Sequence, residues 1–348
     1  MITVERLRGP PFMPAHPHVV ILGAGASKAA FPSGDRNGRL LPLMNDLPDI
    51  LGRSWRDLVA EAKPPDEGFE AQFSWIRSHG GFIKKLQSIE SRIIEYFLDL
   101  ELPDRPTIYD YLVLGLRPKD VIATFNWDPL LLLAHVRNRG VADLPDLRFL
   151  HGCVAFATCP DHDILGGLNE ACPECKKPLI GGRLFFPDKE KDYAKDTIIY
   201  RDWQFVTARL KRAFHLTIFG YSGPATDFNA RRLLLEGWQA TPFRDVSHVE
   251  IIDIRDGENL TRNWRNFIPF HHDMVCREFW DSTIARWPRR IAEYKLSASL
   301  YGLPSENLGP HRTDSLAELQ AWHAEIAKAE KRTDAVAEDE ASTADTPT

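Results

Sequence analysis

The sequence has no long hydrophobic run. Of its 348 residues, 43% are hydrophobic, yet no segment approaches the roughly 20 consecutive apolar residues of a membrane-spanning helix. Residues 1–17 contain Arg6, Arg8 and several prolines but lack the apolar stretch of a secretory signal. We therefore expect a cytoplasmic protein with no membrane partner.

The sequence also lacks an excess of positive charge. Lys and Arg total 43 against 49 Asp and Glu, a formal net charge of -6. Non-specific binding to nucleic acid needs a local excess of basic side chains. We therefore do not expect nucleic acid as the main partner.

Cysteine is scarce, and four of the five cysteines lie within 153–175. In an intracellular chain such a cluster indicates a metal site before a disulfide. Cys159-Pro-Asp-His162 and Cys172-Pro-Glu-Cys175 have the two-residue gaps that let neighbouring ligands share one tetrahedral ion, and zinc is the natural occupant. The predicted ligands are Cys159, His162, Cys172 and Cys175; Cys153 competes with His162, and buried free thiols are the alternative.

A glycine-rich turn follows the first apolar run. Residues 18–22 predict a buried strand, and the turn behind it consists of Gly23, Ala24, Gly25, Ala26 and Ser27. Glycines let a backbone approach a diphosphate closely, and the following helix N-terminus offers amides and a positive dipole end. The spacing is not the full GxGxxG. The turn is predicted to hold dinucleotide phosphates; alternatively it only packs a helix on a strand.

Strands and helices alternate along the chain. We predict further strands over 120–124, 147–150, 215–219 and 249–254, and helices over 130–139, 201–214, 227–238, 279–294 and 315–331. Parallel neighbouring strands need crossover connections. The order therefore predicts an α/β, Rossmann-like parallel sheet with helices on both faces.

The domain prediction has one large unit with extensions at both ends. Residues 18–300 form it, including a helical insertion over about 40–116 and a small zinc-binding module over about 153–180. Residues 1–17 precede it, a helical extension spans 301–332, and an acidic tail over 333–348 is predicted to be disordered. In the extension, Leu316, Leu319, Trp322 and Ile326 have helical spacing, which indicates core packing or an oligomer contact.

Ligands of such sheets bind at the carboxyl ends of the strands. That edge is predicted to gather the 23–27 turn, Thr124, Asn126, Asp128, His151, Gly220, Tyr221, Ser222 and Asp253. An amide, a carboxylate and an imidazole then face one ligand. Three alternatives remain open: Asp128 caps a helix that starts at Pro129, His151 is structural, and Asp253 pairs with Arg255 or Arg262.

Together these residues resemble the sirtuin superfamily, and more closely its bacterial sirtuin-like branch, many members of which cleave NAD in defence against phage. The motifs occur in the family's order: the 23–27 turn with Phe31-Pro32 downstream, Thr124-Phe-Asn126-Trp-Asp128, Leu150-His151-Gly152, the cysteine cluster, and Gly220-Tyr-Ser222 with Pro224 and Asp227. The resemblance spans the chain.

The resemblance implies a substrate and residue roles. The 23–27 and 220–222 turns and Thr124 would hold NAD, Asn126, His151 and Asp128 would form the catalytic group, and zinc would be structural. Breaking the nicotinamide glycosidic bond develops oxocarbenium character, so the catalyst orients a ribose or water hydroxyl and accepts its proton. Asp253 is expected to accept hydrogen bonds from the adenosine ribose.

One segment departs from the family. Protein-deacylating sirtuins have a Phe-Gly-Glu stretch in the peptide groove after the zinc module, where this chain has Phe185-Phe186-Pro187-Asp188-Lys189. We therefore expect an NAD glycohydrolase that releases ADP-ribose and nicotinamide. A protein-lysine deacylase, a non-catalytic sensor of NAD or ADP-ribose and a structural interaction module remain the alternatives, and any trigger has to come from self-association or a separate protein.

Overall fold

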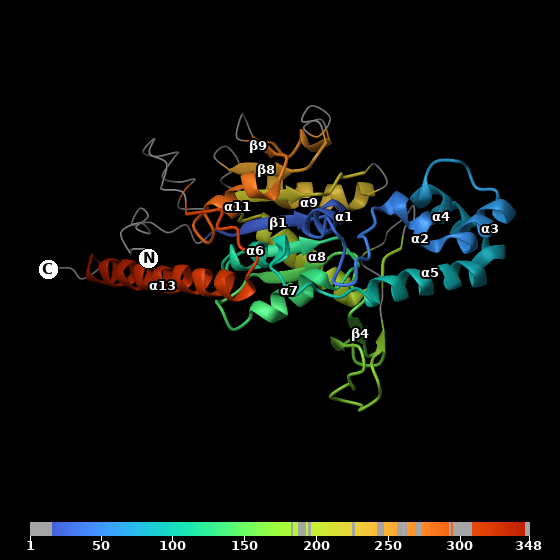
Figure 1. Ribbon diagram of the computed structural model, residues 1–348, viewed down its shortest axis with the longest axis horizontal. Helices are drawn as coiled ribbons and strands as arrows, with labels where there is room; N and C mark the ends of the chain where they lie inside the picture. The colour runs from blue at the N-terminus through green and yellow to red at the C-terminus, as the bar shows by residue number, and fades with distance from the viewer. Residues whose placement is uncertain are drawn as a thin grey trace.

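A six-stranded parallel sheet forms the centre of the computed structural model (Figure 1), which describes residues 16–181, 184–186, 193, 196–224, 227–241, 247–255, 260, 263–268, 273–291, 294 and 308–344. The strand order is β3-β2-β1-β7-β8-β9. The strands are β1 (His18–Leu22), β2 (Val121–Thr124), β3 (Asp146–Phe149), β7 (His215–Phe219), β8 (His248–Ile252) and β9 (Asp273–Cys276). Every pairing within this sheet is parallel.

Both faces of the sheet are covered, as β1 shows. All five residues of β1 are buried. Val20 and Leu22 belong to one apolar core, whereas Val19 and Ile21 belong to another, because successive side chains of a strand point to opposite faces. A run that is apolar on both faces is typical of a parallel strand between two helical layers.

Helices supply those two layers. On the side of Val19 and Ile21, the core includes residues of α8 (Thr197–Leu210) and α9 (Phe228–Gln239). On the opposite side, the core includes residues of α1 (Ala24–Ala30), α6 (Ile108–Leu114), α7 (Leu130–Asn138), α11 (Thr283–Arg286) and α13 (Leu316–Ala344). The predicted Rossmann-like fold is therefore confirmed.

The helical insertion projects from one end of the sheet (Figure 1). It contains η2 (Met44–Asp46), α2 (Leu47–Leu51), α3 (Arg53–Ala62), α4 (Phe69–Ser78), η3 (Gly80–Phe82) and α5 (Ile83–Leu98). Its buried side chains, among them Trp55, Phe73 and Ile93, continue the core of the α1 side. Helix α6, also within the 40–116 segment, packs in the layer with α7.

A second, three-stranded antiparallel sheet projects from the body (Figure 1). It consists of β4 (Phe156–Thr158), β5 (Leu165–Gly167) and β6 (Ile180–Gly181), in the order β5-β4-β6. Its buried core holds only Ala157, Cys159, Cys172 and Leu179. We call residues 153–181 the zinc module.

Two sequence predictions about helices need correction. The predicted helix over 279–294 is wrong: η6 (Phe279–Asp281) is followed by an extended Ser282, whose side chain caps α11. Helix α11 ends at Arg286, and Trp287 is already non-helical, because a residue before proline is disfavoured in the helical region. The structure also continues α13 to Ala344 in place of a disordered tail from Thr333, since the segment is rich in the strong helix formers Ala and Glu.

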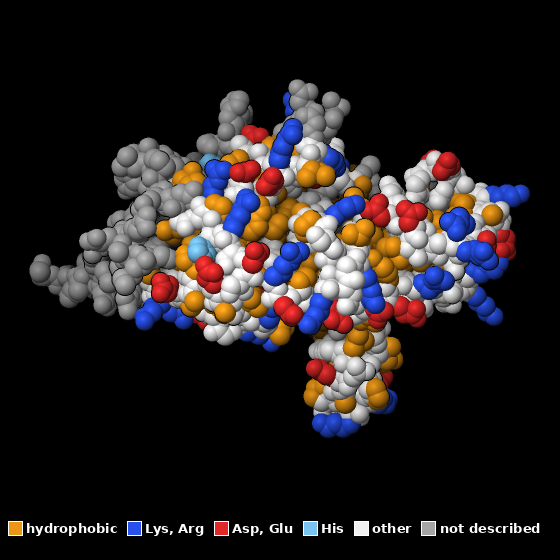
Figure 2. All heavy atoms as spheres, in the orientation of Figure 1, with side chains coloured by type: hydrophobic (Ala, Val, Ile, Leu, Met, Phe, Trp, Pro, Cys, Tyr) orange, Lys and Arg blue, Asp and Glu red, His pale blue; other side chains and the backbone are white. Residues whose placement is uncertain are grey.

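The described helices, the charges on the surface and the packing of α13 bear on the partners that the sequence analysis considers. None of the described helices is long and apolar enough to cross a membrane. Figure 2 shows basic side chains interspersed with acidic ones on the face that it displays. Leu319 and Ile326 of α13 are fully buried, which confirms core packing for these two residues.

Candidate functional site

Four polar turns lie side by side at the carboxyl edge of the sheet, which we call the rim. The strands that lead into them, β3, β2, β1 and β7, are neighbours. Hydrogen bonds continue the ladder past the strand ends: Gly23 N donates to Phe219 O (3.0 Å), Phe125 N to Leu22 O (2.9 Å) and Leu150 N to Thr124 O (2.8 Å). The turns that begin with Gly23, Phe125, Leu150 and Gly220 are therefore held next to one another.

The glycines at the rim allow two turns to touch. Gly25 N donates to Gly220 O over 3.0 Å. A Cβ on Gly23 would lie 2.6 Å from Gly220 O, and a Cβ on Gly220, whose φ is +61°, would lie 2.1 Å from Ala26 N. These glycines thus let the 23–27 turn pack against the 220–222 turn, while Ala24 and Gly25 stay half-buried at the rim.

Asn126 is fixed by its carboxamide nitrogen. Nδ2 donates to Gly23 O (3.0 Å) and Ser27 Oγ (2.9 Å) and lies 3.3 Å from the Tyr109 hydroxyl. The backbone N of Asn126 donates to Thr124 Oγ1 over 3.0 Å. Only 8% of Asn126 is exposed. The side chain is therefore held in one orientation by three elements of the fold.

Asp128 completes this polar group, and its two oxygens have separate partners. Oδ2 accepts a hydrogen bond from Ser27 Oγ (2.7 Å), and Oδ1 accepts one from Leu130 N (3.1 Å). Asp128 thus bonds to the first residue of α7, but the predicted cap needs correction: the N-cap is Pro129, the helix begins at Leu130, and no side chain caps it. Burial raises the pKa of Asp128. We call Ser27, Tyr109, Asn126 and Asp128 the Asn126 network.

The phenol of Tyr109 is protonated at any physiological pH. Burial raises its pKa well above the usual value, and the nearby Asp128 carboxylate raises it further. Because the side chain is fully buried, the hydroxyl has to find its hydrogen bonds inside the protein. Ser27 Oγ, 2.7 Å away, provides one.

His151 lies in an aromatic environment. Its Nε2 shares a hydrogen bond with the Tyr193 hydroxyl (3.0 Å), and the Phe125 ring meets its ring edge to face at 4.8 Å. Trp203 packs against both Phe125 and Tyr193. Burial raises the pKa of Tyr193, so its phenol also stays protonated. We call Phe125, His151, Tyr193 and Trp203 the His151 cluster.

The 220–222 turn contributes mainly packing. The ring of Tyr221 stacks on Phe125 at 4.3 Å, and its hydroxyl donates to Asp227 Oδ2 over 3.0 Å. Ser222 O accepts a hydrogen bond from Asn263 Nδ2 (3.2 Å). The half-buried backbone at Gly220 and Ser222 is therefore what this turn leaves for a ligand.

Asp253 has a protein partner at the end of β8. Its Oδ1 accepts hydrogen bonds from Arg255 N (3.0 Å) and Arg255 Nε (2.9 Å). This is one of the two pairings that stood as the alternative to ribose binding. The other proposed partner, Arg262, lies outside the described residues.

Three cysteines and a histidine converge in the zinc module. His162 Nδ1 lies 3.5 Å from Cys159 Sγ and 3.6 Å from Cys172 Sγ, and the Sγ atoms of Cys159 and Cys175 are 3.7 Å apart. Ordinary zinc bond lengths around a tetrahedron give about 3.7 Å between sulfurs and about 3.6 Å between sulfur and nitrogen. All four ligand atoms lie within 4.8 Å of one another. The residues therefore fit a structural zinc ion.

Cys153 is not part of this group. Its thiol is buried and points at Asp128 O, 3.7 Å away. Burial raises the pKa of the Cys153 thiol to about 12, so it is not a thiolate at neutral pH. The structure thus favours His162 over Cys153 as the fourth ligand.

The rim brings the predicted catalytic residues near one another without a direct bond. Within the described residues no hydrogen bond joins Asn126 to His151. Two consecutive residues belong to different sides of the rim. Phe125 packs on His151, whereas Asn126 donates hydrogen bonds to Gly23 and Ser27. Sequence reasoning missed Tyr109 and Tyr193, which reach the rim from α6 and from the segment after the zinc module.

Comparison with known proteins finds similarity among solved structures alone. No family model and no curated protein matches. A complex of Sir2 with an inhibitor, 2'-O-acetyl-ADP-ribose and a deacetylated p53 peptide is 13% identical, with 82% of this chain and 94% of that chain covered and a TM-score of 0.39. The structure of Sir2Tm bound to a propionylated peptide is 14% identical, with 82% and 93% covered and a TM-score of 0.40.

A third similar structure is the ADP-ribose complex of a Sir2 homologue that carries a serine mutation. It is 15% identical, with 73% of this chain and 93% of that chain covered and a TM-score of 0.34. The roles of individual residues have to come from the rim itself.

Proposed function

We propose that this protein is an NAD glycohydrolase. Water adds to C1' of the nicotinamide ribose, the glycosidic C–N bond breaks, and ADP-ribose, neutral nicotinamide and one proton are formed. One observation carries the proposal: the turns that resemble the sirtuin NAD motifs follow four neighbouring strands and meet at the rim. In open parallel sheets, ligands bind at that edge.

The half-buried parts of the rim support a proposed position for the substrate. The diphosphate lies over Ala24 and Gly25, beside the backbone at Gly220 and Ser222. The nicotinamide ribose then lies between Asn126 and His151, with the Asn126 network on one side and the His151 cluster on the other. Asp253, despite its pairing with Arg255, is the proposed acceptor for the adenosine ribose hydroxyls.

The proposed chemistry divides between the two sides. The imidazole of His151 accepts the proton that the attacking water loses, a role that typically contributes about 10²–10⁴-fold in rate. Asn126 orients that water or a ribose hydroxyl. Asp128 acts through Ser27 rather than on the substrate, because both of its oxygens already have protein donors.

The segment after the zinc module supports hydrolysis over deacylation. Phe186 stacks on Phe73 of α4 at 5.7 Å and packs on Trp127 at 5.1 Å. Phe185 N donates to His151 O over 3.0 Å. Phe185 and Phe186 are therefore packed between the insertion and the rim, at the position where deacylating sirtuins are expected to have a peptide groove.

Zinc has a structural role in this proposal. A site with four protein ligands has no open position for a reacting water. The module starts two residues after His151, and the returning chain bonds to the carbonyl of His151 at Phe185. A bound ion would thus hold both ends of the loop that carries His151.

The direct test is release of nicotinamide from NAD by the purified protein, with and without an acetyl-lysine peptide. We expect release without the peptide and its loss in Asn126→Ala and His151→Ala. Matched controls are His135→Ala and Asn45→Ala, whose side chains bond to Pro145 O and Phe69 N away from the rim. Release only in the presence of peptide would indicate a deacylase, and NAD binding without release a sensor.

We further place this activity in defence against phage, on the strength of the motif resemblance. Cells that express the wild-type protein should lose NAD after infection, and cells that express His151→Ala should retain it. Equal NAD levels in the two strains during infection by a panel of phages would contradict this setting while leaving the enzymatic proposal intact.

A further inference from the structure

Helix α6 carries a tyrosine into the Asn126 network. The hydroxyl of Tyr109 lies 2.7 Å from Ser27 Oγ and 3.3 Å from Asn126 Nδ2. Tyr109 is fully buried, and it lies in α6 rather than in a turn at the end of a sheet strand. Its ring packs edge to face on Phe31 at 5.6 Å. The hydroxyl is thus the one polar group that α6 directs at the network.

The hydrogen positions in the network follow from the chemistry of its members. An ionised Asp128 can only accept, so Ser27 has to donate its single proton to Asp128 Oδ2. Ser27 Oγ then accepts from Tyr109 and from Asn126 Nδ2. Asn126 Nδ2 also donates to the Tyr109 hydroxyl over a longer 3.3 Å, so this proton is shared between Ser27 and Tyr109, and the second Nδ2 proton goes to Gly23 O. Both amide protons are therefore committed inside the protein.

A reversed carboxamide would not fit this site. It would bring Asn126 Oδ1 against Gly23 O, an acceptor without a proton, and would remove a donor from Ser27. With the amide as found, Oδ1 has no hydrogen-bond partner among the described residues. The oxygen is thus the part of Asn126 that remains for a ligand.

We infer that Tyr109 is a positioning residue for Asn126: its hydroxyl, together with Ser27 and Gly23 O, holds the carboxamide so that Oδ1 is presented as a hydrogen-bond acceptor. This inference rests on the proposed NAD hydrolysis and names the contact that Asn126 makes in it. The group that Oδ1 accepts from is a hydroxyl, either the attacking water or a hydroxyl of the nicotinamide ribose.

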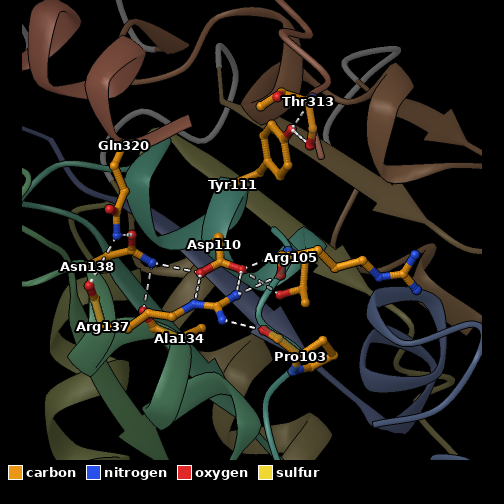
Figure 3. A network of polar contacts seen from close by, with 10 residues as sticks. Pro103, Arg105, Asp110, Tyr111, Ala134, Arg137, Asn138, Thr313 and Gln320 are labelled. Atoms are coloured by element: carbon orange, nitrogen blue, oxygen red, sulfur yellow. Dashed lines mark hydrogen bonds and ion pairs between the residues drawn. The ribbon is translucent and has the colours of Figure 1, made fainter. Parts of the chain in front are cut away.

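The position of Tyr109 is fixed by the residue that follows it. Asp110 is fully buried and accepts hydrogen bonds from Thr107 N (2.7 Å), Arg137 Nε (2.6 Å) and Asn138 Nδ2 (2.8 Å). Figure 3 shows Arg137 and Asn138 of α7 directed at this carboxylate. Since Asp128 Oδ1 accepts a hydrogen bond from Leu130 N at the start of α7, the two ends of the Asn126 network are tied to one helix.

The next residue provides a matched control. Tyr111, on the same helix, accepts a hydrogen bond from Thr313 N at 2.9 Å (Figure 3) and is 7% exposed. Tyr109→Phe and Tyr111→Phe each remove one tyrosine hydroxyl together with its two hydrogen bonds. They should therefore lower stability to a similar extent. Only Tyr109→Phe changes the Asn126 network.

The kinetic test compares these two variants with NAD as substrate. In Tyr109→Phe we expect kcat to fall about 10- to 100-fold while KM changes less than about twofold, because the hydroxyl orients a group that acts in the transition state. Tyr111→Phe should match the wild type in both constants. Equal kcat values for the two variants would overturn the inference.

A second measurement is independent of turnover. The Asn126 side-chain amide protons, followed by 15N-edited NMR, should exchange slowly in the wild type and in Tyr111→Phe and faster in Tyr109→Phe. Rapid exchange in the wild type, or no difference between the variants, would refute the positioning role. Absence of NAD hydrolysis in the wild type would refute the proposed function instead, and the exchange data would then decide the inference alone.

Discussion

The two sides of the rim hold their proposed functional groups by different means. In the Asn126 network, four polar side chains from α1, α6 and the turn after β2 are joined by directional hydrogen bonds of 2.7–3.3 Å. In the His151 cluster, the imidazole shares a hydrogen bond with Tyr193 and packs against aromatic rings. The first side fixes which atom of Asn126 faces outward; the second fixes where a ring lies.

This difference follows the surroundings of each side. The Asn126 network is backed by the largest apolar core, which includes Tyr109, Ala26 and the helices of the insertion. The His151 cluster lies on the second apolar core, which includes Phe125, Tyr193 and Trp203, but the loop that follows His151 leads into a module whose own core has four buried residues. A core that small does not hold a fold by itself, so a metal ion is the expected substitute.

The largest loss of stability should come from a substitution that disturbs both sides of the rim. Gly220 has a φ of +61°, and in Gly220→Ala the new Cβ would lie 2.1 Å from Ala26 N of the 23–27 turn. The next residue, Tyr221, stacks on Phe125 of the His151 cluster, so the substitution disturbs both sides. We expect destabilisation by more than about 4 kcal/mol, or no folded protein. Gly140→Ala, where nothing lies within 4 Å of the new Cβ, is the control. Urea unfolding of both variants measures the difference; a Gly220→Ala protein as stable as Gly140→Ala would show that the two turns do not touch.

Removal of zinc should disorder the zinc module and affect only the His151 side of the rim. Chelation, or Cys172→Ala, should release about one zinc per chain, unfold the module and lower NAD hydrolysis more than about tenfold, because the binding free energy of such an ion is folding free energy. Cys153→Ala should keep its zinc, since Cys153 lies apart from the four ligand atoms. Metal analysis and thermal melting check this; a metal-free protein with an unchanged melting curve would contradict it.

Asp128→Asn should have the smallest effect on stability and act on the Asn126 side alone. Burial raises the folded-state pKa of Asp128 above its unfolded value, so ionisation costs stability and wild-type stability should fall as pH rises through the folded pKa. The variant lacks that step, and its unfolding free energy at neutral pH should stay within about 1 kcal/mol of the wild type. Ser27 loses its charged acceptor, so we expect kcat to fall about tenfold. Urea unfolding across the acidic range and kcat in parallel test this; identical pH profiles would mean that the pKa of Asp128 is the same in the folded and the unfolded protein.

The sequence predicts the sheet well where strands are long and apolar on both faces. β7 has the predicted bounds, and β1, β2 and β3 agree within one residue at each end. The short β9 was missed because Asp273–Cys276 shows neither alternation nor a fully apolar run. Helix α8 begins four residues earlier than predicted, since Asp196 caps it by accepting from Ile198 N and Ile199 N.

At the site, sequence reasoning identified the turns but not the partners that orient their side chains. The edge rule places Asn126 and His151 at the rim, because it depends only on strand order. Tyr109 is 17 residues away from Asn126 along the chain, and no local pattern predicts that tertiary contact. The Thr107-x-x-Asp110 capping box gave the one available signal, the start of α6. Likewise, the choice of His162 over Cys153 needed the distances between ligand atoms.

A crystal structure of His151→Ala with NAD bound would show whether the nucleotide lies on the rim and which atom of Asn126 it contacts. We expect the diphosphate over Ala24 and Gly25 and the nicotinamide ribose beside Asn126. A hydroxyl of water or ribose should lie within hydrogen-bond distance of Asn126 Oδ1. A nucleotide bound elsewhere, or a ribose that contacts Nδ2 in place of Oδ1, would contradict it.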